Sequence, residues 1–444
     1  MQKKFHKLVL IAAAMAPLIP FDSAHAIPAF TRQYKTECST CHTIYPELNE
    51  YGEVFLKNGY VYVNHRAAEK PALPAIQGEG DPSQLEFLKR NAAIPQSGNT
   101  AKETNEAILL SGIPDFLPIS FSASQDIAYD DNAADKLDLA TRALVLQVGG
   151  AFRDKAGFFG TFNLYTEGRY DPFTSNVPGN NSSTVRELFL VWRHAFDTPV
   201  NIRIGRLKPK LSLWKSSNRA TVTSFAPHVY RVGRSQFTLD SPADALEANA
   251  VLANRLFVAA GVVDRNGQDS KEGYGHVSFK VGGADFVGNE PEIDFEKEES
   301  IFDYLMLTCG VYGYYGRNAS VIASVADKTN KFYRAGADVD LSYKRLRLRL
   351  SGVKGKDDNP DFISVPQEVD STVMAAEAEL LIGSEVITTF RYEHQDDGTG
   401  ITRRYIPAVA YAPLQNIRLV AEYKHEISAP ATNRLGQIGI TFSF

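Results

Sequence analysis

The feature that most constrains the fold is an alternation of polarity with a period of two, which starts near Leu117 and continues to the end of the chain. Two runs show it most clearly, with apolar residues at every second position: Leu188, Leu190 and Trp192, then Val200, Ile202 and Ile204. Segments of about ten residues with this alternation, separated by turn residues, are typical of transmembrane β-barrels. The pattern therefore predicts a mostly β chain with an antiparallel barrel at residues 116–444.

The end of the chain repeats the pattern. Ile438, Ile440, Phe442 and Phe444 fall on one face of a final strand. A last strand that ends in phenylalanine resembles the assembly signal of bacterial outer-membrane proteins, so we expect a barrel in the bacterial outer membrane, in contact with lipid. A soluble all-β sandwich is the alternative, but it would give no reason for the apolar outer face or the terminal Phe444.

We count sixteen or seventeen candidate strands and predict sixteen, because bacterial barrels close with even numbers of strands. The count is weakest at residues 207–240 and 285–299. Tight turns are expected at Lys344-Arg345 and Gly383-Ser384, and longer loops at 355–370, 395–400 and 428–433.

The first 26 residues have the pattern of a cleaved secretory signal. Lys3, Lys4 and Lys7 precede an apolar run at residues 8–19, and Ala24-His25-Ala26 provides a cleavage site. The run is shorter than the roughly 20 residues that a spanning helix needs, although a short membrane anchor is an alternative. The formal net charge of -5 gives no indication of a nucleic-acid partner.

The strongest motif is Cys38-Ser39-Thr40-Cys41-His42, the attachment sequence of a c-type haem. Two thiols at this spacing can bond the two vinyl groups of one porphyrin, and the adjacent imidazole can ligate the iron. We therefore expect one covalent haem c on Cys38 and Cys41, with His42 as the proximal iron ligand. Half a zinc site or a local disulfide would also use such cysteines, but there is no second Cys-x-x-Cys sequence.

The second axial ligand is less constrained. His65 is the nearest candidate, whereas Met306 and Met374 are remote in the sequence, and a barrel residue or an open site are alternatives. His194, His228 and His276 are interpreted as ordinary barrel or loop residues. The third cysteine, Cys309, lies in an apolar run and is expected to be a small buried thiol.

The residues after the motif predict a short helix, because Ile44, Leu48, Tyr51 and Phe55 recur at spacings of three and four. Asn58-Gly59 would end it. Four parts follow: a signal peptide (1–26), a haem segment (27–65), an irregular linker or plug (66–115) and the barrel (116–444). A segment of this size is small enough to lodge partly inside a sixteen-stranded barrel.

The sequence resembles the outer-membrane monohaem cytochrome–porin fusions, whose best-known members are extracellular ferrous iron oxidases. The resemblance is specific in the haem segment and generic in the barrel, and it rests on these residues: Ala29-Phe30-Thr31-Arg32-Gln33, CSTCHT, Pro46, Leu48-Asn49, Gly52, Phe55, Lys57, Gly59-Tyr60 and the stretch Ile204-Gly205-Arg206-Leu207-Lys208-Pro209.

This resemblance implies electron transfer from an extracellular donor, Fe(II) above all, through the haem to a periplasmic carrier. As an enzyme, the protein would then be an Fe(II):cytochrome c oxidoreductase. The acidic pairs Asp130-Asp131, Asp357-Asp358 and Asp396-Asp397 could attract cations at loop tips, although such pairs are more often solvated turns. An outward conduit to an extracellular acceptor and a passive porin with a structural haem are the alternatives.

Overall fold

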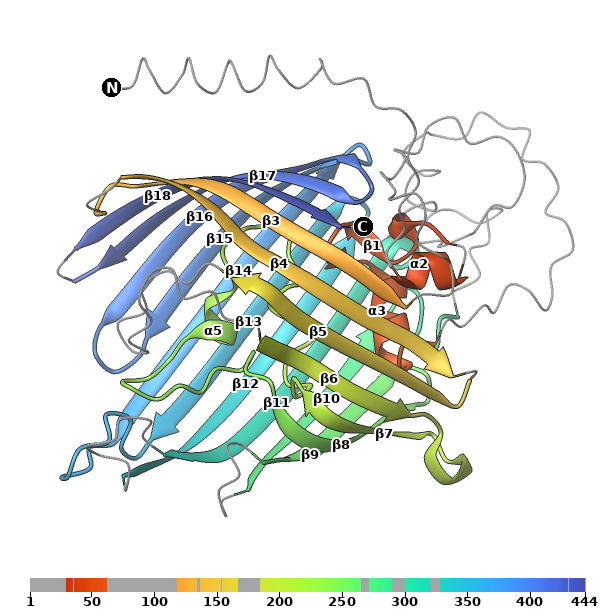
Figure 1. The fold of residues 1–444 in the computed structure, drawn as a ribbon, viewed down its shortest axis with the longest axis horizontal. Coiled ribbons are helices and arrows are strands. Elements are labelled where there is room, and N and C mark those ends of the chain that lie inside the picture. Colours follow the sequence, from red (N-terminus) through yellow and green to blue (C-terminus); the bar gives the residue numbers. More distant parts are fainter. Residues whose placement is uncertain are drawn as a thin grey trace, which may run out of the picture.

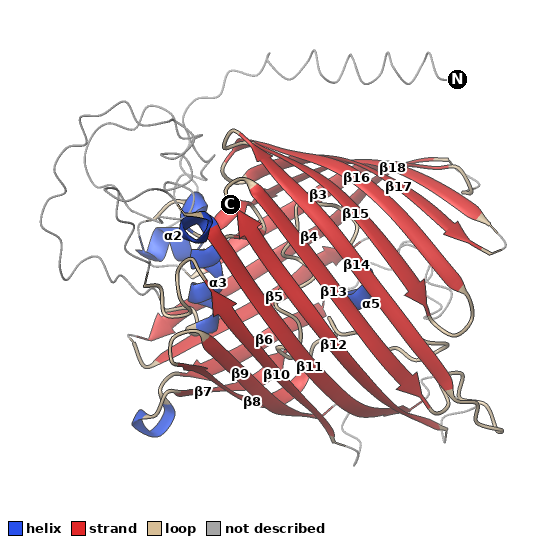
Figure 2. Ribbon diagram, turned by 180° about the vertical axis from the view of Figure 1, so that it is seen from behind, coloured by secondary structure: helices blue, strands red, loops and turns tan. Residues whose placement is uncertain are grey.

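The computed structural model describes residues 29–34, 36–61, 118–133, 136–152, 154–166, 184–264, 271–289, 300–319, 328–429 and 431–443. Within these ranges, antiparallel strands β3 to β18 form one closed barrel (Figures 1 and 2). The prediction of sixteen strands is confirmed. The barrel closes where β18 pairs with β3, with Gly439 opposite Asp126.

The strands have these bounds: β3 (Ile119–Asp130), β4 (Leu137–Phe152), β5 (Ala156–Thr166), β6 (Thr184–Trp192), β7 (Val200–Leu207), β8 (Ala243–Leu252), β9 (Leu256–Asp264), β10 (Glu272–Val281), β11 (Leu305–Ala319), β12 (Thr329–Tyr343), β13 (Leu346–Asp357), β14 (Val369–Ile382), β15 (Val386–Asp396), β16 (Ile401–Leu414), β17 (Ile417–Ser428) and β18 (Thr432–Ser443). Short helices η4 (Ala195–Asp197) and α6 (Ile301–Tyr304) lie between strands.

The two faces of the wall differ in polarity as the sequence predicts. Leu190 and Ile204 are 54% and 56% exposed on the outside, whereas Glu187 and Arg203 are buried on the inside. Successive side chains of a strand point to opposite faces, so one alternating sequence gives an apolar exterior and a polar lumen. This is the arrangement of a barrel that spans a membrane.

The two ends of the barrel differ in their connections. Within the described residues, one end has four turns of two or three residues, at 253–255, 344–345, 383–385 and 415–416, and the seven-residue connection 193–199 between β6 and β7. The other end carries longer connections, such as 358–368 between β13 and β14, although the connection of β17 to β18 is shorter than predicted. The acidic pairs lie at this second end. Asp357, however, is not a solvated turn residue, because it is buried in an ion pair with Arg334.

The longest described connection, residues 208–242 between β7 and β8, folds into the lumen, and we name it the inner segment. It contains only α5 (Ala226–Val229) and no strand, which explains the uncertain strand count there. It crosses to the opposite wall, where Leu213 donates a backbone hydrogen bond to Asp338 of β12 and Thr223 donates one to Glu422 of β17. The inner segment therefore divides the lumen.

Residues 29–61, which we name the motif segment, lie at the short-turn end of the barrel (Figures 1 and 2). They form α2 (Ala29–Tyr34), η2 (Cys38–Thr40), the hairpin strands β1 (His42–Ile44) and β2 (Glu47–Leu48), and α3 (Glu50–Lys57). The predicted helix begins later than its apolar spacing indicates. Ile44 and Leu48 belong to the hairpin, and the Asn49 side chain caps the helix by accepting the Gly52 N–H.

Several predictions concern residues outside the described ranges: the signal at 1–26, His65, the linker at 66–115, and Phe444. The prediction of a buried Cys309 is wrong, because this thiol is exposed on β11. It takes an outward position in the alternation, where an apolar neighbourhood in the sequence does not mean burial. No helix in the described part of the chain has the length and apolar character to cross a membrane.

Candidate cofactor site

The motif segment is held to the barrel by polar contacts at several points of its circumference. The backbone N–H of Cys38 donates to Gln415 Oε1 in the β16–β17 turn at 3.0 Å. On the other side, Lys280 of β10 pairs with Glu50 of α3 at 2.5 Å. The segment is therefore fastened to both sides of the mouth.

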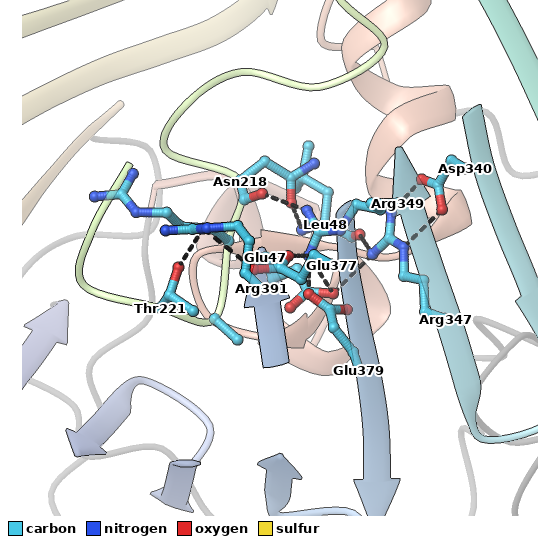
Figure 3. Close-up of polar contacts among 12 residues, drawn as sticks. Glu47, Leu48, Asn218, Thr221, Asp340, Arg347, Arg349, Glu377, Glu379 and Arg391 are labelled. Atoms are coloured by element: carbon cyan, nitrogen blue, oxygen red, sulfur yellow. Dashed lines mark hydrogen bonds and ion pairs between the residues drawn. The ribbon is translucent and has the colours of Figure 1, made fainter. Parts of the chain in front are cut away.

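Glu47 is the most deeply buried of these anchors. Its carboxylate lies 2.7 Å from Arg347 Nη1 and 3.6 Å from Arg349 Nη2, both on β13 (Figure 3). Arg349 also pairs with Glu379, and its Nη1 donates to the backbone oxygen of Asn218 in the inner segment at 2.7 Å. The motif segment, the inner segment and the wall thus share one buried network of charges.

Two glycines allow backbones to approach closely around the motif. A Cβ on Gly52 would lie 2.1 Å from the carbonyl oxygen of Cys41, so α3 can pack on the motif only through a glycine. A Cβ on Gly157 of β5 would lie 2.1 Å from the carbonyl oxygen of Gly59. The motif segment can therefore pack against β5 only because residue 157 has no side chain.

An aromatic stack secures the other end of the segment. Tyr60 lies between Phe30 and Phe159 of β5, with stacked ring centroids at 5.7 and 4.9 Å. Phe55 meets Phe30 edge to face at 4.9 Å. Such ring pairs add about 0.5–1.5 kcal/mol each beyond the burial of their area.

His42 is oriented by the hairpin that follows the motif. Its Nδ1 lies 3.2 Å from the carbonyl oxygen of Glu47. A carbonyl oxygen only accepts hydrogen bonds, so Nδ1 carries the proton and Nε2 presents a lone pair. Burial lowers the pKa of His42 to about 4, which keeps the ring neutral near pH 7. A neutral imidazole that donates its other N–H to a backbone carbonyl is the usual form of a metal-ligating histidine.

Cys38 and Cys41 are free thiols in η2 and the residue that follows it. Burial raises the pKa of each to about 12, so neither is ionised at neutral pH.

The motif faces a cavity of about 460 Å³ between the motif segment, the inner segment and strands that include β3 to β6. Cys38, Cys41 and His42 all line it, so the structure brings the three predicted site residues together. Its volume lies within the range of roughly 300–1,000 Å³ that small-molecule and cofactor sites occupy. Apolar side chains of both segments complete the lining: Phe30, Leu48, Phe55, Leu213 and Trp214.

Two histidines that sequence reasoning set aside also line this cavity. His228 comes from α5, and His276 comes from β10. Each is an ordinary loop or barrel residue by position: the inward fold of residues 208–242 brings His228 to the site, and the inward side of β10 presents His276. No local sequence signal could have identified them. Met374, by contrast, is 50% exposed on the outside of the barrel.

The residues present fit a porphyrin in three respects. The thiol pair and the imidazole, with Nε2 free of a proton, face one cavity, and the lining is largely apolar. Three buried polar atoms in the lining also have no hydrogen-bond partner among the described residues: Asn163 Oδ1, Trp214 Nε1 and His228 Nδ1. Within the described ranges, no group of three or more His, Cys, Asp or Glu residues could hold a metal ion as a separate cluster.

No protein-family model and no curated protein sequence matches this chain. Solved structures do match. An anion-selective porin from Comamonas acidovorans aligns with 13% identity and a TM-score of 0.52, over 73% of this chain and 98% of the porin. The outer membrane channel DcaP of Acinetobacter baumannii aligns with 12% identity and a TM-score of 0.48, over 78% and 99%.

The similarity to the Comamonas porin extends over nearly all of that protein and leaves roughly a quarter of this chain unmatched. At such low identity it establishes the fold alone. A passive channel is consistent with this fold, and the comparisons contain nothing about haem or electron transfer. The chain is therefore a porin-like sixteen-stranded β-barrel with a Cys-x-x-Cys-His motif facing a cavity at its mouth.

Proposed function

We propose that the protein is an outer-membrane electron-transfer protein, with one haem bound covalently by Cys38 and Cys41 and ligated by His42. It takes electrons from an extracellular donor, Fe(II) in the first instance, and passes them to a periplasmic carrier. The observation that carries the proposal is the geometry of His42, whose Nδ1 is committed to Glu47 while its ring faces the same cavity as both thiols.

The location of the motif supports this proposal. The short turns of outer-membrane barrels face the periplasm, so the motif segment lies at the periplasmic mouth. Only a thin layer of protein would separate the haem from a carrier that docks there. The inner segment, which also lines the cavity, lies inside the barrel, so protein and not hydrocarbon occupies part of the roughly 30 Å that an electron would have to cross.

Bound haem iron supplies reversible one-electron oxidation and reduction, which needs no nucleophile or acid–base pair from the protein. The chain's own residues would bind the group, orient His42 and exclude water. Gly52 allows α3 to cover the motif, and Glu47 ties the hairpin to the wall. Apolar lining by Phe55 and Trp214 would restrict solvent access, which is one determinant of the redox potential.

The test uses the full-length protein made in cells that carry haem-maturation machinery. Mass spectrometry should show one covalent porphyrin, and anaerobic stopped-flow mixing with Fe(II) should produce the absorption spectrum of the reduced haem. Absence of covalent porphyrin would overturn the proposal. A loaded protein that Fe(II) does not reduce at any accessible pH would exclude Fe(II) as the donor.

The porin-like fold favours a second candidate function, a passive channel whose haem is structural. Against it, Arg349 and Arg391 point inward and yet are fully buried beneath the motif and inner segments. A lumen filled at this level should conduct few ions. Large, steady conductance in planar bilayers, with a haem that does not change redox state, would favour the channel.

An outward conduit to an extracellular acceptor uses the same site with the opposite direction of electron flow. A redox titration discriminates between the directions. A midpoint potential far below that of the Fe(III)/Fe(II) couple at the working pH would support the outward direction.

A further inference from the structure

Most of the lysines that line the cavity have an acidic partner. Lys57 pairs with Glu53 at 3.0 Å. Lys208 and Lys215, in the inner segment, pair with Asp240 at 2.7 Å and with Glu187 at 3.2 Å. These three ammonium groups are satisfied by the protein itself.

Lys210 is different. It lines the same cavity, but its ammonium group has no ion pair or hydrogen bond to any residue in the described ranges. Its Nζ lies over the ring of Phe257, 4.8 Å from the centroid. Arg186, another cation of the lining, is exposed and can be fully solvated, whereas Lys210 is half-buried.

The nearby acidic group Glu247 attracts Lys210, but the two side chains form no ion pair. Its carboxylate accepts from Arg203 Nη1 at 2.8 Å and from the hydroxyl of Tyr274 at 2.6 Å. It also accepts a hydrogen bond from the backbone N–H of Lys210, so the main chain of Lys210, and not its side chain, contacts the carboxylate. Its single negative charge is thus matched by Arg203.

A half-buried ammonium without an ion pair of its own is costly, because it loses part of its hydration and shares the nearest carboxylate with Arg203. Burial, followed by the charge of Arg203, accordingly lowers the pKa of Lys210 well below its usual value. A carboxylate brought beside it would restore the charged form. The cavity therefore has a position where an anionic group of its occupant would be stabilised.

We propose that Lys210 binds a propionate carboxylate of the haem, an inference that rests on the proposed function. In a c-type haem the thioether bonds and the two propionates belong to different edges of the ring. The cavity presents the thiols from the motif segment and Lys210 from the inner segment, which are separate walls of one enclosure. The inner segment thereby becomes part of the cofactor site and not only a partition of the lumen.

The experiment compares the loaded wild-type protein with Lys210→Met and Lys210→Arg. In the methionine variant, the propionate bending bands of the resonance Raman spectrum should shift and the midpoint potential should fall, because a positive charge beside the ring disfavours the ferric state. The arginine variant should keep both near wild type. Lys356→Met removes an exposed ion pair with Glu368 and should change neither.

Unchanged Raman bands in a fully loaded Lys210→Met protein would overturn the inference, even with a shifted potential, because a distant charge alone can change the potential. The proposed function would survive that result. Absence of covalent haem from the wild type would overturn both. Should the methionine variant fail to fold, Lys210→Gln provides the uncharged comparison and is expected to shift the same bands.

Discussion

Glu47 of the motif segment and Arg347 of β13 form a buried ion pair at 2.7 Å, although 300 residues separate them in the chain. Arg347 also pairs with Asp340 at 2.6 Å (Figure 3). Replacing a carboxylate in such a network leaves a buried arginine with too little negative charge. Breaking a buried pair typically costs about 3–5 kcal/mol.

Glu47→Gln should therefore loosen the motif segment from the barrel. Amide hydrogens of β2 and α3 are expected to exchange faster, and the conductance in planar bilayers should rise. Glu368→Gln, which breaks an exposed pair with Lys356, is the matched control and should leave both measurements unchanged. Wild-type exchange rates in Glu47→Gln would contradict the anchoring role.

Gly157→Ala should displace the motif segment by steric conflict. The added methyl group would lie 2.1 Å from the carbonyl oxygen of Gly59, a contact that only a backbone shift can relieve. Overpacking of this kind costs about 1–3 kcal/mol. Gly313→Ala is the matched control, because a Cβ there meets nothing within 4 Å. Protease sensitivity of the motif segment should increase in the first variant only.

The double variant Cys38→Ala/Cys41→Ala should abolish covalent haem while the barrel still folds. The barrel strands make their hydrogen bonds with each other, so the wall does not depend on either thiol. Haem staining and intact mass measure the loss, and the electrophoretic shift on heating reports the folded barrel. Cys309→Ser, on the outer face of β11, should keep a full complement of haem. Equal haem content in the double variant would refute attachment at the motif.

His228 should make the inner segment sensitive to acid. Burial lowers the pKa of this residue to about 4, with Asp240 opposing the shift and Lys208, Arg219 and Arg391 adding to it. The unfolded form, with a pKa near 6.5, binds the proton more readily. The stability of this region is therefore complete above pH 6.5 and declines as the pH falls toward 4.

Hydrogen exchange of residues 208–242 between pH 7 and pH 4 would measure this decline. Glutamine at position 228 does not titrate, so the exchange of the His228→Gln variant should depend less on pH after correction for the intrinsic rate. An identical pH dependence in the variant would show that another group is responsible.

Much of the wall could be predicted from the sequence because a membrane barrel imposes a local rule. Each strand must alternate, so Leu188, Leu190 and Ile204 indicate their own outward orientation without reference to the rest of the chain. The same rule misleads at Cys309, where apolar neighbours suggest burial and the outward position exposes the thiol. The number of sixteen strands could be predicted because bacterial barrels close with even numbers of strands, and no single residue indicates it.

The candidate site could be predicted only in part. Cys38, Cys41 and His42 are adjacent in sequence, so the motif identifies them. His228 and Lys210 reach the cavity through the inward fold of residues 208–242, which has no periodic pattern, and His276 is one of many inward residues of the wall. The helix α3 begins later than predicted because the β1–β2 hairpin contains Ile44 and Leu48, whose spacing resembles that of a helix. The proposed distal ligand His65 stays a prediction.

The closure of β18 on β3 has a consequence for biogenesis. Ser122 and Thr441, which stand on the two strands of this seam, both line the cavity. A barrel sheet stays open until its first and last strands, β3 and β18, pair with each other. The motif segment precedes all of these strands in the chain. Under the proposed function, a haem-loaded motif segment would be laid against the open sheet, and the pairing of β18 with β3 would then enclose the haem without threading it through a narrow opening.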